Sequence, residues 1–106
     1  MTAEQLRRRL RAERVVPLAT AEWERLAPDF QEVERHGAMP AGDLVILEHE
    51  GQYAAVEQLS AGQSVVRWLA DLEEARRFVG HRLAQYDRMW DGCGCKIDYF
   101  GRDWER

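Results

Sequence analysis

The sequence predicts one α+β domain in which a three-stranded antiparallel sheet is covered by a single long helix. Apolar residues recur at helical spacing over residues 71–90. Before them, short β-rich runs alternate with turns rich in glycine and polar residues. The length of 106 residues and the hydrophobic content of 45% suit one folded domain that spans residues 1–106.

The N-terminal end is expected to begin with a basic helix over residues 3–14. Its apolar stripe is narrow and consists mainly of Leu6 and Leu10. A helix of about 12 residues is marginal in isolation, so the two leucines need a surface to dock on. Residues 15–18 should then be extended, because β-branched residues and a following proline disfavour helix.

A second helix is expected over residues 20–36, which completes a helical N-terminal half. Thr20 suits the N-cap position, and apolar residues from Trp23 to Val33 follow at helical spacing. Pro28 should kink this helix or start a new one, since proline is favoured at the first helical position.

Three strands are expected next, at residues 44–47, 53–59 and 64–69. Their short connections predict an antiparallel meander. A loop of residues 61–63 would place Glu57 opposite Arg67 on the solvent side of the sheet, and Val56 opposite Trp68 beneath the helix.

The covering helix has the clearest boundaries in the sequence. Asp71 and Glu74 form a capping-box pattern at its start, and Gly92 is placed to end it. The apolar face is predicted to contain Leu72, Ala75, Phe78, Val79, Leu83, Tyr86, Met89 and Trp90. Residues 96–100 form a possible short edge strand, and residues 101–106 form a tail.

The most chemically specific segment is Cys93-Gly94-Cys95, which holds the only two cysteines. The intervening glycine allows both sulfurs to converge, so the pair could supply half of a zinc site or act as a redox pair. A lone C-x-C lacks the second half of known zinc patterns, and two packed free thiols are the competing interpretation. A closed zinc site would need His36, His49 or a second subunit, so no cofactor is expected and zinc is the alternative.

Charge is distributed unevenly along the chain. Residues 1–14 sum to +3 and the remainder to −7, for a net charge of −4. The N-terminal cluster of Arg7, Arg8, Arg9 and Arg11 could bind nucleic acid or the acidic body of a second subunit. The body has no basic face interleaved with aromatics, which favours the second possibility over a nucleic-acid partner.

Motifs for an enzyme are not found. The sequence has no Ser-His-Asp spacing, no Gly-rich phosphate loop and no H-E-x-x-H motif. We therefore expect a non-enzymatic accessory or interaction domain, with a thiol or zinc protein and a nucleic-acid binder as alternatives. The sheet edges, the N-terminal helix and Trp104 in the tail predict a homodimer. Without a secretory h-region or an apolar run long enough for a bilayer, a cytoplasmic protein without membrane contact is expected.

Overall fold

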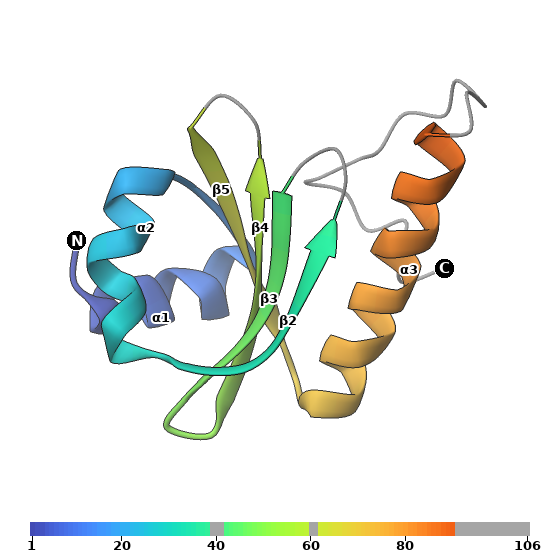
Figure 1. Ribbon diagram of the computed structural model, residues 1–106. Helices are drawn as coiled ribbons and strands as arrows, with labels where there is room; N and C mark the ends of the chain where they lie inside the picture. Colours follow the sequence, from blue (N-terminus) through green and yellow to red (C-terminus); the bar gives the residue numbers. More distant parts are fainter. Residues whose placement is uncertain (39–41, 60–61, 91–106) are drawn as a thin grey trace.

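The structure is a computed structural model that describes residues 1–38, 42–59 and 62–90 (Figure 1). These residues form a five-stranded antiparallel sheet with strand order β1-β5-β4-β3-β2. The elements in chain order are α1 (Ala3–Glu13), β1 (Val15–Ala19), α2 (Thr20–Leu26), the 3₁₀ turn η1 (Ala27–Asp29), β2 (Gln31–Ala38), β3 (Gly42–His49), β4 (Gln52–Leu59), β5 (Gln63–Leu69) and α3 (Leu72–Trp90).

The α+β class is confirmed, but the three-stranded meander was too small, because the sheet has five strands. The strands β3, β4 and β5 form the centre of the sheet as expected, and β1 and β2 extend it at either edge. The N-terminal half is therefore mixed rather than helical. The segment expected to be extended at residues 15–18 is β1, which pairs with β5 through Val16 opposite Val66.

The helix expected over residues 20–36 ends at Leu26, and β2 takes its second half. Pro28 lies in the 3₁₀ turn, and Phe30 then adopts an extended backbone with φ −112° and ψ 146°. Val33, which fitted a helical stripe, is exposed at a β-bulge. Pairing with β3 satisfies a row of backbone groups that a helix would have left unpaired at the sheet edge, so tertiary context overrides the local pattern.

The sheet is covered on both faces, which was not expected. Figure 1 shows α1 and α2 against one face and α3 against the other. We call these the α1/α2 face and the α3 face. The first buries the side chains of Leu6, Leu10, Val16, Leu18, Trp23, Leu26, Val45, Leu47, Ala54, Val56 and Val66. The second buries Leu44, Ile46, Ala55, Leu69, Ala75, Phe78 and Val79.

The predicted pairing of β4 with β5 was wrong by two residues. Val56 lies opposite Val66 rather than Trp68, and Glu57 lies opposite Val65 rather than Arg67. Gly62 has a φ of 73° and directly precedes β5. A three-residue hairpin loop takes a left-handed residue at its last position, so the loop ends at Gly62, one residue earlier than predicted. This one-residue shift of the loop changes the strand pairing by two residues.

The start of α3 agrees with the sequence prediction. The Glu74 amide donates to the Asp71 carboxylate at 2.8 Å, and the Ala70 amide donates to the Glu74 carboxylate at 2.8 Å. Thr20 does not cap α2, because its hydroxyl contacts that of buried Ser64 at 2.9 Å. Gly92, the possible strand at residues 96–100 and the tail at 101–106 lie outside the described residues. Within the described residues, no helix has both the length and the apolar character to cross a bilayer.

Candidate functional site

The structure separates the residues proposed for a zinc site. Cys93, Cys95 and Trp104 lie outside the described residues, so a thiol or zinc function for the pair stays a prediction. His36 pairs with Leu44 and lies on the α3 face, whereas His49 pairs with Gln52 on the α1/α2 face. Among the residues that the structure describes, no group of three or more His, Cys, Asp or Glu side chains could hold a metal ion.

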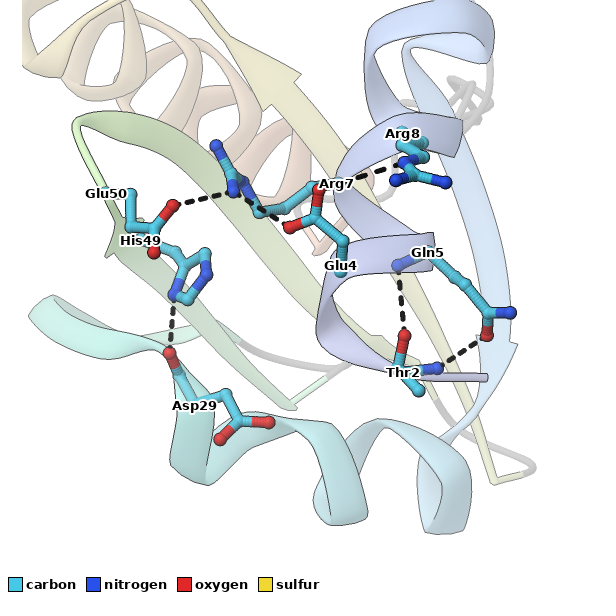
Figure 2. A network of polar contacts seen from close by, with 8 residues as sticks. All are labelled: Thr2, Glu4, Gln5, Arg7, Arg8, Asp29, His49 and Glu50. Carbon is cyan, nitrogen blue, oxygen red and sulfur yellow. Dashed lines mark hydrogen bonds and ion pairs between the residues drawn. The ribbon is translucent and has the colours of Figure 1, made fainter.

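The N-terminal arginines are largely neutralised by carboxylates of the same chain. Figure 2 shows Arg7 between Glu4 and Glu50, and its Nη1 lies 3.1 Å and 2.9 Å from their carboxylates. Arg8 joins the same network through Glu4, whose other carboxylate oxygen lies 3.8 Å from the Arg8 Nε, and Arg8 lies on the side away from Glu50. The predicted cluster therefore does not form one continuous cationic surface.

Arg9 is also paired, with Glu13 one turn further along α1. Its Nε lies 2.7 Å from the Glu13 carboxylate. The hydrogen bond from Arg9 holds the pKa of Glu13 below its ordinary value, and the same bond raises the pKa of Arg9. Both groups are solvent-exposed, so this pair neutralises charge locally and adds little to folding stability.

Arg11 and Arg14 differ from the other arginines of this segment. Both are exposed, and neither forms an ion pair with the described residues. The Arg14 guanidinium lies 5.0 Å from the centroid of the Trp68 ring, within cation–π range. The Trp68 amide also donates to the Arg14 carbonyl at 2.8 Å. These contacts fix the end of α1 against β5 and leave two cationic groups facing solvent.

A hollow of about 200 Å³ lies beside these cations, where α1 meets the tip of the β3–β4 hairpin and the end of β5. Its lining consists of Arg11, Glu50, Gly51, Gln52, Trp68, Leu69 and Ala70. Sites for whole small molecules are usually about 300–1,000 Å³. The hollow is smaller and open to solvent, so it suits a side chain or a short stretch of backbone. We call Arg11, Arg14, Trp68 and this hollow the α1 corner.

The hairpin tip is held in place by backbone geometry and by polar contacts. Glu50 and Gly51 both have positive φ, at 50° and 81°, as a two-residue hairpin requires. Arg7 fixes Glu50 from α1, and His49 donates from Nδ1 to the Asp29 carbonyl at 2.7 Å (Figure 2). The tip that forms one wall of the hollow is therefore braced from two sides.

Gln52 is the least satisfied polar side chain at the α1 corner. Its Oε1 and Nε2 are both buried and have no hydrogen-bond partner among the described residues. Leaving a buried polar group unsatisfied costs about 1–3 kcal/mol. Native structures contain few such groups, and each calls for a structural or functional explanation.

A second group of polar residues lies buried on the α3 face. Glu57, Arg67 and Arg82 are at most 3% exposed. The Arg82 Nε lies 3.3 Å from the Glu57 carboxylate. The centroid of the Phe78 ring lies 4.8 Å from the Arg67 guanidinium and 5.3 Å from that of Arg82. We call this group the buried charge cluster. It is enclosed between sheet and helix, and its contacts join α3 to β4 and β5.

The sequence contained a usable signal for one member of this cluster. Arg82 lies four residues after Phe78 and three after Val79, which places it on the apolar face of α3. The prediction treated that face as purely apolar. Strand alternation likewise places Glu57 on the same sheet face as Ala55. Burial of Glu57 was not predicted, because that face of the sheet was expected to contact solvent.

Comparisons of the chain with protein-family models, with curated proteins and with solved structures find no match. Any function must therefore be argued from the geometry of the chain itself. The α1 corner is the accessible candidate, because it combines two cations that pair with no described carboxylate, an aromatic ring and a hollow at the surface. The buried charge cluster offers comparable chemistry without access.

Proposed function

We propose that the chain is a non-enzymatic interaction domain and that the α1 corner is its contact surface for an acidic partner. The observation that carries the proposal is the pair of exposed arginines, Arg11 and Arg14, beside Trp68 and an open hollow. Arginine and tryptophan are enriched at the energetically dominant positions of protein interfaces. Their conjunction with a recess supports recognition rather than a purely structural role.

The charge distribution favours a short acidic protein segment over a nucleic acid. Two unpaired arginines suffice for one or two carboxylates, whereas a nucleic acid is usually held through many phosphates. The net charge of −4 repels an extended polyanion, because charges within about 8–10 Å interact at physiological salt. A compact acidic segment engages the α1 corner and avoids most of that repulsion.

Titration with a short acidic peptide, capped triglutamate, monitored by isothermal calorimetry, tests the proposal. Arg11→Ala and Arg14→Ala should each weaken binding, and higher salt should weaken it further. Arg8→Ala is the matched control, since Arg8 lies on the same helix, is exposed and points away from the hairpin. Equal losses in all three variants would replace a local site with general attraction to α1. Absence of binding would reject the proposal.

Self-association of this domain remains a separate proposal. Two of the sequence arguments for a dimer are weakened by the structure. Leu6 and Leu10 dock on their own sheet, and the edge strand β2 is protected by charged side chains and a bulge. The body still carries the negative charge that a second α1 corner could bind. We expect a dimer by light scattering at high micromolar concentration, weakened by Arg11→Ala. A monomeric wild-type protein would contradict it. Deletion of residues 1–14 is unsuitable, because it would remove core leucines.

A further inference from the structure

We infer that the α1 corner recognises an extended acidic peptide through two groups, with Arg11 binding a carboxylate and Gln52 binding the adjacent peptide group. The inference rests on the proposed function and adds the chemical class of the ligand. It assigns a role to Gln52, whose amide atoms are buried beside the hollow without partners among the described residues.

The chemistry of the Gln52 amide matches that of a backbone peptide unit. A glutamine side chain offers one carbonyl acceptor and one N–H₂ donor, and a peptide group offers the complementary N–H and C=O. An extended segment in the hollow can therefore pair with both ends of the amide. A carboxylate alone can accept from Nε2 but cannot donate to Oε1 when ionised.

Gln52 can turn toward a ligand without losing a hydrogen bond. Its amide atoms have no described partner in the present conformation, so reorientation breaks no hydrogen bond with the described residues. The terminal torsion of glutamine is broad, which allows the amide to adapt to a bound segment. Binding would convert two unsatisfied groups into two hydrogen bonds, so the free protein is biased toward its ligand.

Arg11 remains available because the nearby carboxylate is already engaged. Glu50 lines the same hollow, but its carboxylate lies 2.9 Å from the Arg7 guanidinium. Arg7 itself is further held by Glu4. Among the described residues, no carboxylate therefore pairs with Arg11 at the hollow. A ligand carboxylate can supply the negative charge through a charge-assisted hydrogen bond.

Two probes separate the peptide contact from the carboxylate contact. The first is a short capped peptide of alternating glutamate and glycine, and the second is glutarate, which carries carboxylates without a peptide group. Each is titrated into the full chain and into the variants Gln52→Met and Arg11→Ala, with calorimetry as the readout. Gln58→Met is the matched control, because Gln58 is half-buried on the same strand and does not line the hollow.

Gln52→Met should weaken binding of the peptide by about 25-fold to 100-fold, because two hydrogen bonds are lost and each net hydrogen bond is worth roughly a factor of five to ten. It should weaken glutarate binding by at most about fivefold to tenfold, since a carboxylate can only accept from Nε2. Arg11→Ala should weaken both probes, and Gln58→Met neither. A Gln52→Met variant that binds the peptide as tightly as wild type overturns the inference, while triglutamate binding at the arginines would still support the proposed function. Failure of all acidic probes to bind rejects both. Tighter binding of a single-stranded oligonucleotide than of the peptide overturns the peptide assignment.

Discussion

The two faces of the sheet are built in different ways. The α1/α2 face is covered by aliphatic and aromatic side chains, including the fully buried Leu6 and Leu10, and its polar groups gather at the α1 corner. The α3 face has an apolar cluster of similar kind but encloses a glutamate and two arginines as well. Polar chemistry is therefore accessible on one face and enclosed on the other.

This difference shows that burial, and not residue type, distinguishes the candidate binding site at the α1 corner from the buried charge cluster. Arg14 and Arg82 both lie near an aromatic ring, yet Arg14 is exposed and Arg82 is fully buried. Removing one partner of a buried ion pair leaves an uncompensated charge, which is strongly destabilising. An exposed arginine can be replaced at little cost to folding stability. Because it faces solvent, it is also accessible to a binding partner.

The largest expected effect is on the α3 face. Glu57→Leu should lower the free energy of unfolding by about 3–5 kcal/mol, because it leaves buried Arg82 without the carboxylate that lies 3.3 Å away. The double variant Glu57→Leu/Arg82→Leu should lose less than the sum of the single variants, since apolar residues can replace a buried pair. Denaturant unfolding measures all three. Additive losses would show that the two side chains act independently.

The α1/α2 face should respond to loss of apolar volume. Leu10→Ala should lower the free energy of unfolding by about 2–5 kcal/mol, because Leu10 is only 1% exposed.

Two variants of α3 serve for comparison. Leu83→Ala should lower the free energy of unfolding by less than Leu10→Ala does, since Leu83 is only partly buried. Arg77→Ala on the exposed side of α3 should stay within about 0.5 kcal/mol. Equal losses in these three variants would mean that the faces of the helices are assigned wrongly.

The α1 corner should gain stability when its unsatisfied amide is replaced. Gln52→Met should raise the free energy of unfolding by about 1 kcal/mol, because it removes two buried polar atoms that lack partners among the described residues. Thermal or denaturant unfolding detects such a gain. A marked loss of stability would show that the amide makes a stabilising contact, and would remove the basis for its role in ligand recognition.

The smallest expected effect concerns the pH dependence of the contact between α3 and β2. The hydrogen bond from Arg76, followed by that from His36, lowers the pKa of Glu34. The unfolded chain therefore holds the proton of Glu34 more tightly, and stability from the pair is present above the ordinary glutamate pKa and is lost as pH falls through the folded-state pKa. Glu34→Gln should flatten that part of a Tm-against-pH profile. An unchanged acid limb would show that the exposed pair contributes nothing.

Local signals in the sequence predicted much of the fold. The helix α1 follows from the spacing of Leu6 and Leu10, and the start of α3 after Asp71 follows from its capping residues. The three central strands follow from β-rich runs separated by turn residues. The β2 segment could not be predicted in this way. Its residues fit a helical spacing, and only pairing with β3 across the sheet decides between the two conformations.

The candidate site was predicted only in part. Arg11 belonged to the predicted cluster, but the sequence could not show that Arg7 and Arg9 are paired with carboxylates while Arg11 and Arg14 are not. The Arg7–Glu50 contact joins residues far apart in the chain, so it depends on the docking of α1 against the hairpin. Gln52 gave no local signal, because partial burial of an amide is a property of the assembled corner.

Mapping of the triglutamate contact by backbone amide NMR tests most directly whether the accessible corner, and not the α3 face, is the recognition surface. We expect amide shifts at Arg11, at residues 50–52 and at residues 68–70, which surround the hollow. Amides near Glu57 and Arg82 should not shift, because that cluster is enclosed between sheet and helix. Shifts concentrated on the α3 face, or spread evenly over the surface, would contradict the account.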